Sequence, residues 1–283
     1  MADAPTLDID HLRSWIGRED TAAELVTAEL VRRFRATFDE DPGAPLPSQA
    51  VPRLLHWCLA QPAAPSHALG PDGHPARGGF LPPVPLPRRM WASGRLAFHG
   101  EIRVGDTMRR ISRIESVEAK AGRTGALCFV TVRHEIDVDG RPTLSETQHI
   151  VYRGLDAGGP PASAPEPAAE GAFRRAVDPS PPLLFRYSAL TFNGHRIHYD
   201  DPYVTQVEGY PGLVVHGPLQ ATLLYRFAAE IRGAPPVRFS FRGLSPAFAN
   251  VPLFLNAEED AGKLTLWTAR AGGPVAMQAE AEW

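Results

Sequence analysis

The stretch PLQATLLYRFAAEI, from Pro218 to Ile231, decides the expected fold class of this 283-residue chain. Its apolar side chains recur three or four positions apart and would share one face of a helix: Leu219, Leu223, Leu224, Phe227, Ala228 and Ile231. Alternating apolar residues then predict strands at 237–241, at 264–266 and at 275–283, with a turn at Ala271-Gly272-Gly273. A long apolar helix followed by antiparallel strands predicts an α+β protein whose sheet wraps around the helix.

The N-terminal half shows the same order of elements. Thr21 and Glu24 match a capping box, and apolar residues at every fourth position predict a helix after it: Ala22, Val26, Leu30, Phe34 and Phe38. A second set of apolar residues at helical spacing predicts another helix over residues 51–59. The apolar period changes to two between Cys128 and Val138, and Asp139-Gly140 predicts a hairpin turn before a strand over 144–152. The two halves are therefore expected to be structurally related.

A segment rich in Pro, Gly and Ala separates these halves. Residues 154–182 offer no apolar periodicity, and their prolines would stiffen them into a spacer. We therefore predict an N-terminal domain over 1–153, a linker over 154–182 and a C-terminal domain over 183–283. The second domain is expected to begin with a short strand from Leu183 to Leu190.

Composition and charge narrow the classes of function. The net charge of −3 and a pI near 6.4 give no electrostatic basis for binding nucleic acid or a membrane surface. Cys58 and Cys128 stand in apolar surroundings, which disfavours a disulfide scaffold and fits a reducing cytoplasm. Residues 1–10 show no secretory signal, and no uncharged apolar run reaches the roughly 20 residues that span a bilayer. We therefore expect a soluble cytoplasmic protein.

Two polar motifs stand just before the predicted long helix. Thr191 to Asp200 reads TFNGHRIHYD and combines an amide, imidazoles and a carboxylate, whereas Gly209 to Pro218 reads GYPGLVVHGP and ends at the helix start. An imidazole can deprotonate a water near neutral pH. Backbone N–H groups at a helix N-terminus can stabilise a developing oxyanion. The combination predicts chemistry on a thioester-activated double bond.

These motifs resemble those of a known family. Asn193-Gly194-His195-Arg196-Ile197-His198 is similar to the Asp-x-Asn-Pro-aliphatic-His signature of the (R)-specific enoyl-CoA hydratases, the MaoC-like hot-dog proteins. Val215-His216-Gly217-Pro218 resembles the Ala-His-Gly-Met step at the start of their central helix. Segments 79–91 and 187–193 look like the double hot-dog branch of the family. The resemblance covers nearly the whole chain and implies a double hot-dog fold, with two antiparallel sheets each wrapped around a long central helix.

The resemblance also assigns roles to residues. Where the family has Asp and Asn, this chain has Asn193 and His195, so the resemblance implies that His198 is the general base and acid. Asn193 would orient the attacking water, and the N–H of Gly217 would stabilise the oxyanion. His195 and His216 complete the expected substrate-binding set; alternatively, His195 only stacks in the loop and His216 only shapes the turn. The N-terminal half lacks such a motif and is expected to be catalytically silent.

Arg88 and Arg89 are the predicted anion-binding residues. They follow a proline-rich loop and would pair with CoA phosphates or with a free carboxylate of the acyl group, the alternative being exposed surface charge. A loop carboxylate such as Glu208 is expected to be solvated. We expect no metal, because His195, His198 and Asp200 share one loop, whereas catalytic zinc ligands normally lie on separate rigid elements. No glycine-rich nucleotide loop is present, so we expect no cofactor, with a CoA thioester as substrate.

The resemblance implies the reversible hydration of an enoyl thioester, first of all mesaconyl-C4-CoA, which would give citramalyl-CoA. Two alternatives stay open: dehydration of fatty (3R)-hydroxyacyl thioesters, and a non-catalytic acyl-thioester-binding subunit. A hot-dog thioesterase is disfavoured, because its site would be rich in carboxylates. The expected partner is an acyl-CoA substrate. The chain would act as a monomer or, slightly preferred, as a homodimer.

Overall fold

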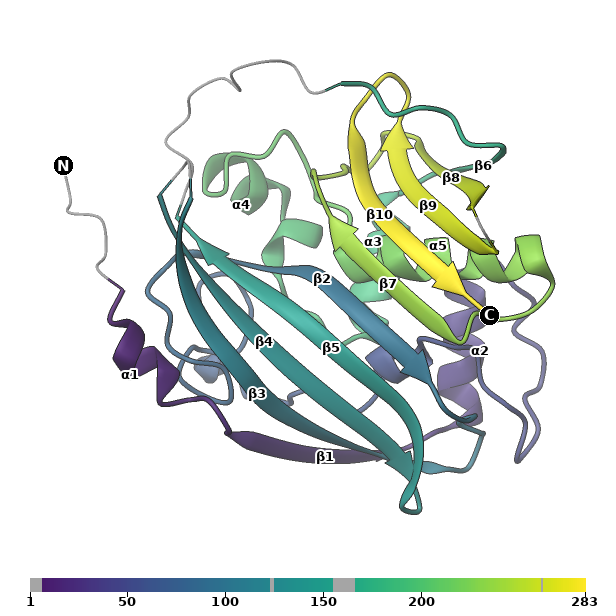
Figure 1. Ribbon diagram of the computed structural model, residues 1–283, viewed down its shortest axis with the longest axis horizontal. Helices are drawn as coiled ribbons and strands as arrows, with labels where there is room; N and C mark the ends of the chain where they lie inside the picture. Colours follow the sequence, from purple (N-terminus) through teal and green to yellow (C-terminus); the bar gives the residue numbers. More distant parts are fainter. Residues whose placement is uncertain (1–6, 123–124, 155–165, 261) are drawn as a thin grey trace.

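The computed structural model describes residues 7–122, 125–154, 166–260 and 262–283 (Figure 1). Within these ranges, ten strands form one antiparallel sheet in the order β1-β3-β4-β5-β2-β7-β10-β9-β8-β6. The strands are β1 (Glu19–Leu25), β2 (Arg88–Phe98), β3 (Thr107–Gly122), β4 (Gly125–Val138), β5 (Arg141–Arg153), β6 (Phe173–Val177), β7 (Arg238–Gly243), β8 (Leu253–Asp260), β9 (Lys263–Arg270) and β10 (Val275–Glu282). The first five strands of the order come from the N-terminal half and the last five from the C-terminal half.

Helices cover one face of this sheet. The α-helices are α1 (Ile9–Arg13), α2 (Ala28–Thr37), α3 (Pro181–Leu190), α4 (Asp201–Gln206) and α5 (Gly217–Arg232), and the 3-10 turns are η1 (Leu55–Cys58), η2 (Ser66–Ala68) and η3 (Arg196–His198). In Figure 1, α5 lies behind β7 and β10, and it also contacts β8 and β9. Its fully buried residues include Leu219, Leu224 and Ala228, as the sequence predicted. No helix among the described residues has the length and apolarity needed to cross a bilayer.

The two halves share one hydrophobic core. Pairing of β2 with β7, from Ser93 opposite Arg242 to Ala97 opposite Arg238, joins the two parts of the sheet. Below this junction α2 of the N-terminal half packs on α3 of the C-terminal half. One cluster therefore contains buried residues of both halves, among them Val31, Phe34, Leu55, Leu59, Leu184, Leu224 and Phe239, and a second, smaller cluster lies within the N-terminal half. Buried apolar side chains thus line the junction between the halves.

Most predicted strands of the sheet are confirmed. The hairpin of β4 and β5 turns at Asp139-Gly140, where both residues have positive φ, as a two-residue turn requires. β7, β9 and β10 match the predicted C-terminal strands. The sequence did not predict β1, β2, β3, β6 and β8. The predicted pair of sheets is one continuous sheet, and among the described residues only α5 is longer than ten residues.

The predicted helix at the N-terminus begins later than expected. Residues 19–25 form β1, which pairs with β3, and the helix starts after Thr27, whose Oγ1 accepts a hydrogen bond from the N–H of Leu30. The capping-box prediction at Thr21 was therefore wrong. The carboxylate of Glu24 instead accepts a hydrogen bond from the N–H of Ala60, 2.5 Å away. Tertiary pairing has overridden a local signal.

Three further elements differ from prediction. Residues 181–190 form helix α3 rather than a strand, because Pro181 and Pro182 suit its first turn and Leu184, Tyr187 and Ser188 lie on one buried face. The helix predicted over 51–59 is only the 3-10 turn η1, preceded by Leu54 with φ of +69°. Within the predicted linker, β6 pairs with β8 at the sheet edge. Residues 155–165 of that linker lie outside the described part of the chain.

Candidate active site

The first polar motif forms a tight loop between α3 and α4. The N–H of Asn193 donates to the carbonyl of Ser188 at 2.8 Å, and Oδ1 of Asn193 accepts from the N–H of His195 at 3.0 Å. Asp200 caps α4 by accepting from the N–H of Tyr203 at 3.1 Å, and it also binds Arg196. Asn193 is thus a turn-forming residue, and its amide NH2 is the part of the side chain left to contact a water or substrate.

A row of imidazoles lies beside this loop. The rings of His198 and His216 stack with centroids 3.6 Å apart, and the ring of His195 meets that of His198 edge-on at 5.2 Å. The Nε2 of His216 lies 2.8 Å from the hydroxyl of Ser188, whereas its buried Nδ1 has no hydrogen-bond partner. The structure therefore brings together three histidines that the sequence predicted separately. His216 is fully buried, and its ring packs against one face of the ring of His198.

The tautomer of His198 follows from its hydrogen bond. Its Nδ1 lies 2.7 Å from the carbonyl oxygen of Val214, which can only accept, so Nδ1 carries the proton. Val214 is itself fixed, because its N–H donates to the carbonyl of Ile197 and it bridges to Phe248. The lone pair of His198 is consequently on Nε2. His198 can therefore accept a proton through one defined nitrogen.

Burial keeps these imidazoles neutral. It lowers the pKa of His198 to about 3, although the hydrogen bond to Val214 acts in the opposite direction. Burial also lowers the pKa of His195, and nearby His74 and His198 add to that effect. The pKa of His216 is lowered most strongly by burial and then by the other two rings of the row. At neutral pH the row offers lone pairs and carries no positive charge.

The start of α5 places Gly217 beside β2. His216 is the residue before the helix, and no side chain caps the first turn, so the N–H groups there have no partner within the helix. A Cβ on Gly217 would lie 3.7 Å from the carbonyl oxygen of Trp91 and 3.8 Å from Cε of Met277, which are ordinary contacts. The protein itself therefore leaves space for a larger residue at position 217. That space is consistent with close approach of a ligand to the helix N-terminus.

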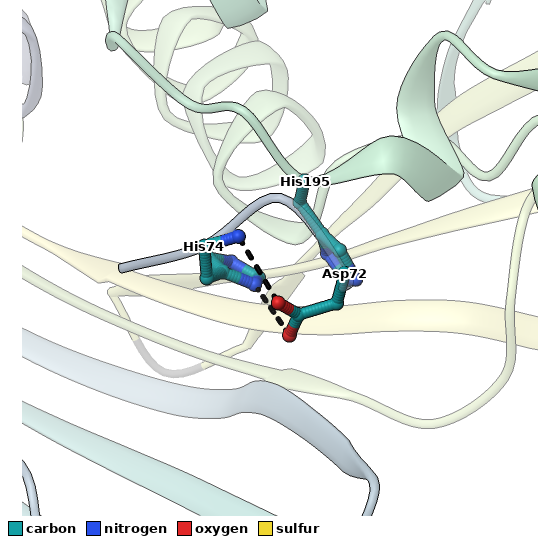
Figure 2. Close-up of side chains that lie close together, drawn as sticks. All are labelled: Asp72, His74 and His195. Atoms are coloured by element: carbon teal, nitrogen blue, oxygen red, sulfur yellow. Dashed lines mark hydrogen bonds and ion pairs between the residues drawn. The ribbon is translucent and has the colours of Figure 1, made fainter. Parts of the chain in front are cut away.

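A loop of the N-terminal half completes the cluster. Asp72 accepts hydrogen bonds from the backbone N–H and from Nδ1 of His74, both at 3.1 Å, and the ring of His74 lies 4.2 Å from that of His195 (Figure 2). Neither Asp72 nor His74 was predicted from the sequence, and this half was expected to be silent. The available signal was Asp72-Gly73-His74, a carboxylate and an imidazole flanking a glycine.

Backbone contacts hold this loop against the motif. The N–H of Arg196 donates to the carbonyl of Asp72 at 2.9 Å, and its Nη1 donates to the carbonyl of Pro71 at 3.0 Å. Gly73 has φ of +86°, and a Cβ there would lie 2.0 Å from the carbonyl oxygen of Gly194. Only glycine can therefore occupy position 73 with the two loops in this contact.

Asp72, His74 and His195 also have the spacing of metal ligands, since their potential ligand atoms lie within 4.8 Å of one another. Two observations favour a hydrogen-bonded pair instead. Nδ1 of His74 is already used by Asp72. The positive charge of Arg89 acts on Asp72, His74 and His195 and would oppose a cation among them. We therefore assign these side chains to hydrogen bonding.

The two predicted anion-binding arginines differ in environment. Arg88 donates from Nε to Oε2 of Glu208 at 2.9 Å and from Nη2 to the carbonyl of Glu208, and both side chains are about nine-tenths buried. The pair links β2 to the segment after α4. Arg88 is thus committed to Glu208, which corrects the expectation of an anion-binding Arg88 and of a solvated Glu208. Arg89 is half-buried, and its charge acts on the Asp72–His74 pair, so it remains the candidate for an anionic group.

Fold and site together define an acyl-thioester hydro-lyase of the double hot-dog class. The profile of the hydroxyacyl-thioester dehydratase type 2 family matches residues 54–249. The chain belongs to this family of MaoC-like hot-dog dehydratases. It is 43% identical to mesaconyl-C(4)-CoA hydratase of Chloroflexus aurantiacus over 272 residues, covering 95% of this chain and 96% of that one. It is 30% identical to the mitochondrial hydroxyacyl-thioester dehydratase type 2 of Schizosaccharomyces pombe over 223 residues, covering 70% and 74%.

Solved structures support the fold. HtdX of Mycobacterium tuberculosis superposes with a TM-score of 0.67 at 20% identity, covering 94% of this chain and 99% of that one. A second protein of that organism, described as having a double hotdog fold, superposes with a TM-score of 0.55 at 17% identity, covering 94% and 95%. The predicted double hot-dog α+β fold and the predicted hydro-lyase activity are confirmed.

Proposed function

We propose that this enzyme hydrates mesaconyl-C4-CoA to citramalyl-CoA, with His198 and the N-terminus of α5 at the reacting centre. The relative of that name, similar over 95% of this chain, supports the substrate. The observation that carries the mechanism is the hydrogen bond from Nδ1 of His198 to the carbonyl of Val214, because it leaves Nε2 free to bind a water. Arg89 would receive the free carboxylate of the acyl group.

The addition of water then proceeds in two steps. The water held by Nε2 of His198 passes a proton to a neutral imidazole of the site, which later returns it to Cα, as the water oxygen bonds to Cβ of the enoyl group and the electron pair of the double bond moves onto the thioester oxygen. The N–H of Gly217 stabilises the resulting enolate oxygen. Cα then takes up a proton as the thioester carbonyl is restored. The NH2 group of Asn193 and the ring of His195 border the water, and the turn held by Oδ1 of Asn193 keeps this loop in place.

The direct test follows the absorbance of the enoyl-thioester band after the protein is mixed with mesaconyl-C4-CoA and, separately, with crotonyl-CoA. We expect rapid loss of the signal with mesaconyl-C4-CoA. In His198→Ala, kcat should fall about 10³-fold while acyl-CoA affinity changes only a few fold, because the attacking water loses the nitrogen that holds it, and a group engaged in general acid–base catalysis contributes about 10²–10⁴. Full activity of this variant would refute the role of His198.

A second candidate activity is the dehydration of fatty (3R)-hydroxyacyl thioesters. The family profile and the relative from Schizosaccharomyces pombe favour it. Turnover of crotonyl-CoA with no turnover of mesaconyl-C4-CoA would select this activity. Binding of both thioesters without turnover would instead select a non-catalytic acyl-thioester-binding subunit. Homodimerisation, a cytoplasmic location and the absence of a cofactor stay predictions.

A further inference from the structure

The catalytic cluster contains one carboxylate–imidazole pair, and it comes from the N-terminal half. Asp72 holds His74 through two hydrogen bonds, one to the ring and one to the backbone. The side chains of Asp72 and His74 remain 16% and 22% exposed, and both lie beside His195 (Figure 2). Position 193, where the family signature has Asp, holds an amide whose oxygen is engaged by the N–H of His195. The carboxylate of the motif, Asp200, is paired with Arg196, so Asp72 supplies the negative charge beside the imidazoles.

The hydrogen-bond partners of His198 and His74 decide which of these two rings can take up a second proton and become positively charged. His198 is held by a neutral carbonyl and stacked on the buried ring of His216. A proton on His198 would have no adjacent anion to balance its charge, which is costly in a buried site. His74 has that anion, and its hydrogen bond to Asp72 leaves Nε2 as the acceptor nitrogen. Both rings border His195, at 4.2 Å for His74 and 5.2 Å for His198.

We propose that His74, oriented by Asp72, is a catalytic residue that takes the proton of the attacking water and returns it to Cα. The water lies beside His195, where Nε2 of His198 accepts its other hydrogen bond. The O–H bond breaks, the proton moves to Nε2 of His74, and the oxygen bonds to Cβ as the electron pair moves to the thioester oxygen. The N–H bond of His74 then breaks as the Cα–H bond forms. His74 is neutral again, and no other reactant is consumed.

The construction of the loop supports this role. The contacts of Arg196 with Pro71 and Asp72, and the close approach of Gly73 to Gly194, fix the pair against the motif. These contacts join loops about 120 positions apart in the sequence and fix the position of His74 without using its Nε2. Precise placement of this kind is what a proton-transfer group needs.

The inference rests on the proposed hydratase activity, and its test is kept distinct. Whichever enoyl-CoA the unaltered protein hydrates is used to compare His74→Gln, His74→Ala and Asp72→Asn, with His67→Gln as a matched control. His67 is an exposed histidine of the same segment. We expect kcat of His74→Gln to fall about 10²-fold with KM nearly unchanged. Added imidazole should restore part of the activity of His74→Ala and leave His67→Gln unaffected.

The pH dependence of kcat separates a proton-transfer role from a structural one. Burial lowers the pKa of His74 and the hydrogen bond to Asp72 raises it, while the charges of Arg89 and Arg77 lower it, and the rings of His195 and His198 also face this residue. Hydration needs neutral His74, so kcat should fall on the acid side as His74 becomes protonated. Asp72→Asn removes the carboxylate that raises the pKa of His74, so the acid limb of the pH profile of kcat should move to lower pH.

Two results would overturn the inference while leaving the hydratase activity intact. One is a kcat of folded His74→Gln within threefold of the unaltered protein. The other is an acid limb that does not move in Asp72→Asn. Near-ultraviolet circular dichroism and acyl-CoA binding by each variant confirm that the site is formed. If the unaltered protein hydrates neither thioester, the proposed function fails first, and this inference fails with it.

Discussion

Among its described residues, the N-terminal half contains two histidine–carboxylate pairs that are alike in chemistry and unlike in surroundings. In one, Nε2 of His56 lies 3.3 Å from Glu146; in the other, Nδ1 of His74 lies 3.1 Å from Asp72. The side chains of the first pair are 4% and 1% exposed, and those of the second are 22% and 16% exposed. The geometry of a pair is thus a poor guide to its role, and its neighbours are more informative.

The neighbours of the His56–Glu146 pair are structural. Glu146 accepts further hydrogen bonds from the indole N–H of Trp57 and from the amide of Gln148, both at 3.0 Å. The ring of Trp57 meets those of Trp91 and Phe241 edge-on, across the β2–β7 junction. The Asp72–His74 pair faces imidazoles of the motif and Arg89 instead. The His56–Glu146 pair lies within the hydrophobic core. The Asp72–His74 pair borders the imidazoles between which proton transfer is proposed.

The largest effect should come from breaking the buried pair. Glu146→Ala leaves the indole of Trp57 and the ring of His56 without their acceptor, so we expect a loss of about 3–5 kcal/mol in the free energy of unfolding. Urea denaturation measures this loss. The control Glu135→Ala removes an exposed carboxylate of β4 and should cost at most about 1 kcal/mol. Equal stability of the two variants would contradict the distinction drawn between the pairs.

The same pair predicts a pH dependence of stability. Burial alone would raise the pKa of Glu146, but the hydrogen bond and charge of His56, together with the charge of His134 and the hydrogen bond of Gln148, outweigh it and hold the pKa below its ordinary value. A carboxyl group with a lowered folded-state pKa stabilises the fold above its unfolded-state pKa, and this contribution is lost as the pH falls through the folded-state value. Glu146→Gln should therefore show a smaller loss of Tm between pH 6 and pH 3 than the unaltered protein, in thermal melts at both pH values.

An effect of intermediate size is expected at Arg89, where substitution should change KM, whereas substitution of Arg88 should change stability. Arg89→Gln should raise KM for mesaconyl-C4-CoA about tenfold, because a charge-assisted hydrogen bond to the free carboxylate contributes about 1.5–3 kcal/mol. KM for crotonyl-CoA, which has no such carboxylate, should stay unchanged. Arg88→Gln should instead lower stability, since it leaves Glu208 buried without its partner. An equal rise in KM for both thioesters would argue against a carboxylate site at Arg89.

The smallest effect is expected at Asn193. In Asn193→Asp a carboxylate oxygen can still accept from the N–H of His195, so the turn is retained and kcat should change by less than about fivefold. Asn193→Ala removes the acceptor and should lower kcat further, because the turn loosens. Steady-state kinetics of the two variants give the comparison. Complete loss of activity in a folded Asn193→Asp protein would show that the amide N–H groups are required.

The sequence predicted the C-terminal half better than the N-terminal half for a physical reason. In α5 the apolar period, the Gly-Pro start and the burial all agree, so local and tertiary preferences coincide. At Thr21 they conflict: the local capping pattern predicts a helix, but pairing with β3 imposes a strand. β1 is almost entirely exposed, so it also lacked the apolar alternation by which a strand is recognised.

The site was predicted only as far as it is local in sequence. His198, His216 and Gly217 stand in two nearby motifs, and the structure brings them together as expected. Asp72 and His74 lie more than a hundred positions away and reach the motif through a loop contact that leaves no periodic pattern in the sequence. The pairing of Arg88 with Glu208 was also out of reach, because nothing in either local sequence indicates the other residue.

The β2–β7 junction has a consequence for how the enzyme tolerates dilution. Because the loop bearing Asp72 and the loop bearing His198 belong to one polypeptide joined through a continuous sheet, their encounter is intramolecular. A site assembled from two separate chains would come apart as the protein concentration falls below the dissociation constant of the pair. Here the specific activity should stay constant down to the lowest concentrations that can be assayed, whatever the oligomeric state of the whole molecule.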